Sequence, residues 1–160
     1  MNSKKLTVTI LLGIVLVAFA FGMYNYQRRV QSSQEQKITQ QEGRLVRMHS
    51  PVLGPQNAPV TIVEFFDPAC ETCRAFYPIV KRMVNASFGQ VRLVVRYAPL
   101  HQGSDTAIKI LEAARQQGKY WEALERAMAT QPQWAAHDRA QPEMIWDLIG
   151  DIGLDMAKAR

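Results

Sequence analysis

A chain of 160 residues with 48% hydrophobic residues has room for one globular domain and some additional length. Its net charge of +5 does not indicate nucleic-acid binding, because Lys4, Lys5, Arg28 and Arg29 supply four of the positive charges and residues 31–160 contain 15 basic and 14 acidic residues. The only two cysteines are three positions apart, which excludes a disulfide between distant parts of the chain.

The N-terminal residues have the pattern of a membrane-targeting segment. Leu6–Met23 is an almost unbroken apolar run with basic residues on both sides. As a helix it would span about 27 Å, close to the thickness of the hydrocarbon core of a bilayer. The alternative is a secretory signal peptide with a small-x-small cleavage site at Ala18-Phe19-Ala20. We therefore predict a membrane anchor or signal peptide over residues 1–23.

A polar segment follows this run. Residues 24–48 contain six glutamines and few large apolar residues, and are predicted to be a stalk or linker. The sequence leaves open whether this stretch is flexible or partly helical. Residues 49–160 form the predicted domain, which begins with a turn-rich stretch at 51–59.

A strand, a helix and a second strand come next. Val60–Phe66 is β-branched and aromatic, apolar on both faces and bounded by turn residues, so it is predicted as a central strand. Apolar residues at helical spacing predict a helix that begins at about Cys70 and ends near Phe88-Gly89. Val91–Tyr97 has the pattern of a second buried strand. This order predicts a βαβ unit with parallel strands, and hence an α/β fold.

The rest of the chain has helical patterns and no further strand or hairpin signal. Three helices are predicted, at Thr106–Gln117, Tyr120–Ala129 and Glu143–Ile149. Glycines follow the first and the third of these stretches. We expect residues from about 104 to 160 to form a helical subdomain.

The motif Cys70-Glu71-Thr72-Cys73 stands where the first strand passes into its helix. At this spacing the sulfurs can form a local disulfide with little strain, and the helix N-terminus would stabilise a thiolate on Cys70. Because the thiolate is the reactive form, we expect Cys70 to be an exposed nucleophile and Cys73 a buried resolving thiol. An inert local disulfide and a metal half-site are the alternatives, although structural zinc needs more ligands than the isolated His49, His101 and His137 provide.

Three acidic or polar residues in or near the motif are candidates for influencing the protonation of the two thiols. Glu64 shares an apolar strand face and lies six residues before Cys70, so we expect burial to raise its pKa and the carboxyl to exchange protons with the thiols. The alternative is an acid at the strand end that reaches solvent. Glu71 and Thr72 are expected to modulate the pKa of the Cys70 thiol, and the negative charge of Glu71 to make the pair less oxidising. His101 is predicted to be an ordinary loop histidine.

The segment from Asn57 to Cys73, which contains Val60–Phe66, Asp67-Pro68 and the two cysteines, resembles the active-site segment of the DsbA-like branch of the thioredoxin superfamily. Glu64 matches an acid that this branch has six residues before its first cysteine, and Pro78 resembles the helix proline of thioredoxins. The resemblance covers about residues 45–160. It implies a thioredoxin-like fold with a helical insertion and a dithiol–disulfide exchange protein outside the cytoplasm.

The chain departs from that family in two respects. Glu71-Thr72 replaces the proline and histidine common between the cysteines, so the resemblance does not fix the redox direction. The family also has a cis-proline loop and further strands after its helical insertion, which neither Pro132 nor Pro142 matches. We therefore expect the C-terminal strands to be missing, a sheet edge to be unpaired, and the isolated chain to be marginally stable or aggregation-prone.

Taken together, these patterns predict a thiol–disulfide oxidoreductase that acts on cysteines of exported proteins. No cofactor, resident metal or nucleic-acid partner is expected. Residues 6–23 would contact the membrane, where a membrane redox partner is also possible, with the domain in the periplasm or another extracytoplasmic space. A soluble periplasmic protein after signal cleavage is the alternative location. The alternative functions are a non-catalytic metallochaperone or assembly module, and an inactive fragment.

Overall fold

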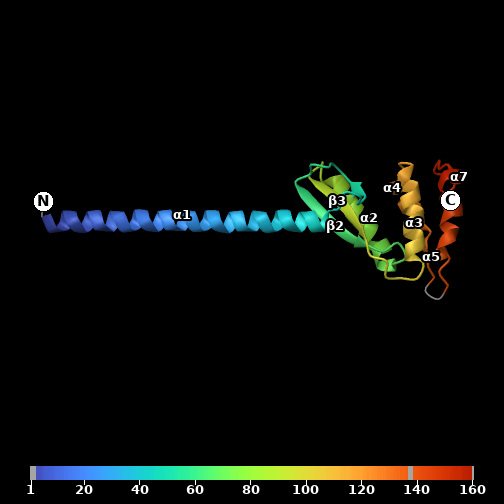
Figure 1. The fold of residues 1–160 in the computed structure, drawn as a ribbon, viewed down its shortest axis with the longest axis horizontal. Helices are drawn as coiled ribbons and strands as arrows, with labels where there is room; N and C mark the ends of the chain where they lie inside the picture. Colours follow the sequence, from blue (N-terminus) through green and yellow to red (C-terminus); the bar gives the residue numbers. More distant parts are fainter. Residues whose placement is uncertain (1–2, 137–138, 160) are drawn as a thin grey trace. The chain divides into compact units, whose positions relative to one another are not determined.

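The computed structural model describes residues 3–136 and 139–159, which fall into a helical N-terminal unit up to residue 45 and a second unit from residue 46 onward (Figure 1). In the first unit, α1 (Ser3–Leu45) is one continuous helix that includes most of the predicted stalk. No helix among the described residues has both the length and the apolar character required to cross a membrane. Part of the segment predicted as a membrane anchor or signal peptide falls outside this finding, because residues 1–2 and the side chains of 3–10 and 15 lie outside the described part.

The second unit is built on a small mixed sheet. Its strands are β1 (Val52–Leu53), β2 (Val60–Phe66) and β3 (Val91–Tyr97), in the order β1-β3-β2. β2 and β3 pair in parallel from Val60 opposite Val91 to Phe66 opposite Tyr97, whereas β1 pairs antiparallel with β3. The predicted parallel pair is confirmed.

Two features of the sheet differ from the sequence prediction. β1 was not predicted, because two residues in a stretch rich in proline and glycine carry no readable alternation. β2 was predicted as a central strand, but in the described sheet it is an edge strand and β3 is central. Val60 and Phe65 on β2 are accordingly exposed, while the middle of β3 is buried.

One helix joins the parallel strands. α2 (Glu71–Ala86) follows β2 after a short turn and contains Pro78 without ending there. Beyond the helix, Phe88 and Gly89 both have positive φ, and Gly89 adopts this left-handed conformation at no steric cost. The chain thus reverses direction and enters β3, so the first residues of α2 lie at the carboxyl end of β2.

The remaining described residues form a helical segment. Its longer helices are α3 (Ser104–Gln116) and α4 (Tyr120–Ala129). Four shorter elements follow: α5 (Gln131–Trp134), a 3₁₀ turn η1 (Pro142–Met144), α6 (Ile145–Leu148) and α7 (Met156–Ala159). All three predicted helices are present, although the third is divided into η1 and α6; α5 and α7 were not predicted.

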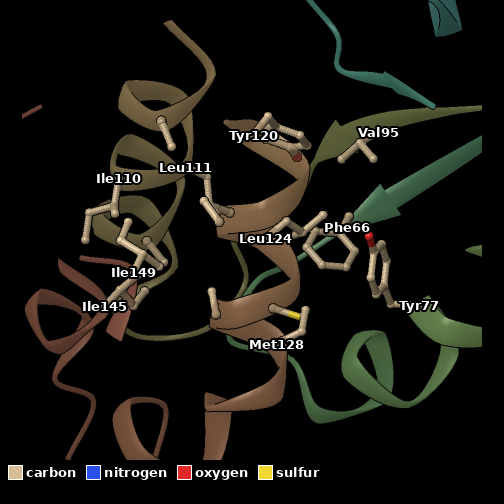
Figure 2. Close-up of a cluster of buried hydrophobic side chains, with 14 of the residues drawn as sticks. Phe66, Tyr77, Val95, Ile110, Leu111, Tyr120, Leu124, Met128, Ile145 and Ile149 are labelled. Atoms are coloured by element: carbon tan, nitrogen blue, oxygen red, sulfur yellow. The ribbon is translucent and has the colours of Figure 1, made fainter. Parts of the chain in front are cut away.

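A single hydrophobic core connects the helices with the sheet (Figure 2). α4 lies at its centre and packs against residues from the sheet and α2 on one side, and against α3 and α6 on the other. The fully buried side chains that meet across α4 include Phe66, Leu111, Leu124, Ile145 and Ile149. This common core fixes the helical segment against the β2–α2 turn, where the cysteines are.

Candidate redox site

Cys70 lies at the N-cap of α2, between the turn that follows β2 and the first helical residue. Its backbone is extended (φ −80°, ψ 123°), its amide donates to the Asp67 carbonyl at 3.1 Å, and its carbonyl accepts from the Arg74 amide at 3.0 Å. No side chain caps the helix. The amides and the dipole at the N-terminus of α2 therefore favour negative charge beside Cys70.

Cys73 is one helical turn further on. Both cysteines are free thiols and half-buried, so the predicted contrast between an exposed and a buried sulfur is not found. Burial, assisted by the Cys70 thiol and the charge of Glu64, raises the pKa of the Cys73 thiol to about 11, despite an opposing hydrogen bond from the Asp67 backbone. Cys73 is consequently protonated at neutral pH.

Glu64 of β2 lies beside Cys73. Both residues line a hollow of about 250 Å³, and the Glu64 charge acts on the Cys73 thiol. Desolvation by burial raises the pKa of the Glu64 carboxyl, and its Oε2 is buried without a hydrogen-bond partner in the described residues. The other lining residues of the hollow are Ile62, Val63, Thr72, Phe76 and Val80.

The two residues between the cysteines are both exposed in the first turn of α2. Thr72 lines the hollow with Cys73, whereas Glu71 places a carboxylate near the helix N-terminus. Within the described part of the chain, no group of three or more His, Cys, Asp or Glu residues is arranged to hold a metal ion. His137, one of the residues weighed as a ligand, lies outside that part.

Asp67 is a buried residue of the site that the sequence did not single out. Its side chain is 4% exposed. Its two oxygens accept hydrogen bonds from the turn before α2 and from the loop and first residue of α3. Oδ1 accepts from the Ala69 amide at 2.9 Å and from the Ser104 hydroxyl, while Oδ2 accepts from the amides of Leu100 and His101 at 2.8 and 3.0 Å. Burial by itself would raise the pKa of Asp67, but these bonds outweigh it and hold the pKa below the ordinary 3.8.

His101 has a more specific environment than the predicted ordinary loop histidine. Its Nδ1 lies 2.8 Å from Oδ2 of Asp67, so the two form an ion pair whenever the imidazole is protonated. The loop before α3 is thereby attached to the turn before α2 by both backbone and side-chain contacts of His101. The sequence signal available was the Asp67-Pro68 turn, which does not show where the carboxylate finds its partners.

Gln131 of α5 is the other residue that sequence reasoning missed. It is 1% exposed, and its Nε2 donates to the carbonyls of Pro68 and Cys70 at 2.7 and 2.9 Å. These two acceptors fix the orientation of the amide, because only its nitrogen can donate. Its Oε1 is buried without a partner among the described residues, which costs about 1–3 kcal/mol. A buried glutamine before Pro132 has no recognisable sequence signature.

Comparison with known proteins gives a consistent result. The family described as Thioredoxin matches residues 47–156. A thioredoxin-like oxidoreductase from Silicibacter pomeroyi superposes with a TM-score of 0.59 at 36% identity, covering 71% of this chain and 62% of that one. The thiol-disulfide exchange protein alpha-DsbA2 from Wolbachia pipientis superposes with a TM-score of 0.61 at 25% identity, covering 80% and 66%.

Curated relatives match this chain over a small part of their length. A protein named Na(+)/H(+) antiporter NhaA 3, from Salinispora tropica, is 36% identical over 112 residues, which are 68% of this chain and 16% of the antiporter. Human DnaJ homolog subfamily C member 10 is 36% identical over 63 residues, or 36% of this chain and 8% of that protein. The chain therefore spans about a sixth or less of the curated relatives it matches.

Proposed function

Because the chain belongs to the DsbA-like branch of the thioredoxin family, we propose that it exchanges disulfides with cysteines of other proteins through Cys70 and Cys73. The observation that carries this proposal is the placement of two free thiols at the start of α2, with Cys70 at its N-cap and Cys73 in its first turn. A helix N-terminus favours the thiolate that such exchange requires.

The reaction has two nucleophilic steps. In the reducing direction, the Cys70 thiolate attacks a substrate disulfide, forms a mixed disulfide and releases one substrate thiolate. Cys73 then loses its proton and attacks the Cys70 sulfur, which releases the second substrate thiolate and leaves a Cys70–Cys73 disulfide. The substrate gains two electrons and two protons, and the protein loses the same number. Oxidation of a substrate dithiol is the reverse sequence.

Glu64 is the proposed proton acceptor for Cys73. A thiol with a pKa of about 11 needs a base before it can attack. Glu64 lines the same hollow, and its Oε2 has no hydrogen-bond partner among the described residues. Burial raises the pKa of Glu64 and so brings it closer to that of the thiol, which favours proton transfer. The apolar lining of this hollow would receive the substrate polypeptide near Cys73.

The redox direction depends on how well the dithiol form is stabilised. Glu71 places a negative charge in the first turn of α2, where it opposes a thiolate. We therefore propose a pair that is less oxidising than one with a histidine in that position. Glu71→Gln should make the protein more oxidising in equilibrium with glutathione, and an unchanged equilibrium would contradict this assignment.

The compartment follows from the chemistry. Disulfides persist in exported proteins and are rare in the cytosol, so we propose an extracytoplasmic location and exported proteins as substrates. A second thiol protein, such as a membrane-bound redox partner, would return the pair to its starting state after each cycle.

The test is insulin reduction by the full chain in the presence of dithiothreitol. We expect turnover by the wild type and none by Cys70→Ser, because Cys70 provides the attacking thiolate. Cys73→Ser should accumulate a mixed disulfide with the substrate, since the resolving thiol is absent. Ala75→Ser, an exposed hydroxyl on the same helix, is the matched control and should retain activity. Turnover by Cys70→Ser at the wild-type rate would refute the proposal.

A further inference from the structure

The turn that carries Cys70 is held at both ends by residues of the helical segment. At its start, the Asp67 carboxylate binds the Ala69 amide within the turn, and the Ser104 hydroxyl and the Leu100 and His101 amides outside it. Ser104 begins α3, and the amides belong to the loop before it. Asp67 therefore connects the turn with the N-terminus of α3.

At its other end, the turn is held by α5. The Gln131 amide donates to the Pro68 and Cys70 carbonyls, 63 and 61 positions earlier in the chain. The Cys70 carbonyl also accepts from the Arg74 amide in the first helical hydrogen bond of α2. Gln131 therefore acts directly on the peptide group that begins the helix.

We propose that Asp67 and Gln131 are positioning residues that couple the Cys70 turn to the helical segment and favour the dithiol form of the pair over its disulfide. This inference rests on the proposed thiol–disulfide exchange. It adds that part of the redox equilibrium is set by Gln131, which is 61 positions after Cys70, and by the Asp67 carboxylate, whose partners Leu100, His101 and Ser104 are more than 30 positions away.

The reason why these contacts favour the dithiol form lies in the charge on Cys70. A thiolate exists only in the dithiol form, and it is stabilised by the amides of the first turn of α2 only if the turn holds the sulfur near them. Loss of either contact loosens the turn and weakens this stabilisation, whereas the disulfide carries no charge to lose. By linkage, a contact that favours the dithiol form must also stabilise that form more strongly against unfolding.

The experiment equilibrates the full chain with glutathione buffers: protein dithiol plus glutathione disulfide gives protein disulfide plus two glutathione molecules. The variants are Asp67→Asn and Gln131→Ala. The matched controls are the exposed Asp105→Asn on α3 and Gln133→Ala on α5. We expect the two variants to shift the equilibrium about three- to tenfold toward the disulfide, the size of one ordinary hydrogen bond. The controls should match the wild type.

Chemical unfolding of both redox forms provides the second readout. The proposal requires each variant to destabilise the dithiol form more than the disulfide form, by the factor seen in the glutathione equilibrium. Equal destabilisation of both forms with an unchanged equilibrium would overturn it, since that is the result of a merely structural role. If Asp67→Asn does not fold, Ser104→Ala removes one donor to the same carboxylate and makes the same prediction. A wild type that forms no disulfide in these buffers would instead refute the proposed function.

Discussion

Glu64→Gln separates two effects that the Glu64 carboxylate has on Cys73. Its negative charge helps to raise the pKa of the Cys73 thiol, while its Oε2, which has no partner in the described part of the chain, can accept the proton of that thiol. The substitution keeps the size of the side chain but removes both the charge and the basic group. If charge alone matters, Cys73 becomes more reactive; if Glu64 is the proton acceptor, the step that uses Cys73 becomes slower.

The magnitudes decide between these outcomes. With a pKa of about 11, the Cys73 thiolate is on the order of one molecule in 10⁴ at pH 7, compared with about one in 10² for an ordinary thiol with a pKa of 9.0. Complete removal of the shift would therefore raise the thiolate fraction about 100-fold, and Glu64 is the smallest of the causes that raise it. General base catalysis contributes about 10²–10⁴-fold. We expect the loss of the general base to outweigh the gain in thiolate fraction. The attack by Cys73 should therefore slow by about tenfold or more.

The assay isolates the step in which Cys73 attacks. The full chain is prepared as a mixed disulfide between Cys70 and glutathione, and release of glutathione is followed by rapid quenching between pH 6 and 9. Alkylation of Cys73 by iodoacetamide in the Cys70→Ser background measures the thiolate fraction by itself. The exposed Glu122→Gln is the matched control. Release as fast as or faster than in the wild type, with alkylation raised in parallel, would show that Glu64 acts only through its charge.

Three further predictions concern stability, each measured by chemical unfolding of the reduced protein. Leu124→Ala should lower the free energy of unfolding by about 2–5 kcal/mol, because Leu124 is fully buried, whereas Leu100→Ala, at an 83% exposed residue, should change it by less than about 0.5 kcal/mol; equal effects would contradict the described core. The raised pKa of Glu64 means that this carboxyl favours the folded state below about pH 4.5 and loses that advantage as pH rises through its folded pKa, so Glu64→Gln should gain stability relative to the wild type toward neutral pH. A difference in stability between Glu64→Gln and the wild type that does not change with pH would refute this. The lowered pKa of Asp67 has the opposite effect, because the stability that this carboxylate contributes is present above pH 3.8 and is lost at more acidic pH. The stability deficit of Asp67→Asn should therefore shrink as pH falls below 3.8, and a deficit that persists there would contradict the assignment.

The sequence predicted best what local patterns encode. Val60–Phe66, Val91–Tyr97 and Tyr120–Ala129 have the predicted bounds because each is a continuous apolar or amphipathic run between turn residues. A strand followed by C-x-x-C similarly predicted a cysteine at a helix start, where Cys70 lies. β1 and α5 were missed because two and four residues contain only about one period of a strand or a helix, so no repeating pattern is present in them.

Long-range contacts were beyond the reach of the same patterns. Asp67 has partners more than 30 positions away and Gln131 more than 60, so neither role follows from the neighbouring residues. The edge position of β2 was mispredicted for a related reason: apolar residues on both faces indicate burial in a sheet, but not which strands supply the pairing.

The most direct test of the central claim is the mass of the full chain after equilibration with a series of glutathione redox buffers and acid quenching. We predict a reversible transition between a dithiol form and a form lighter by two hydrogens, with a Cys70–Cys73 bond identified by peptide mapping. Cys70→Ser and Cys73→Ser should both abolish that transition, while Ala75→Ser should retain it. A chain that stays in the dithiol form across the whole series, or that cannot be reduced once oxidised, would contradict the assignment of Cys70 and Cys73 as an exchanging redox pair.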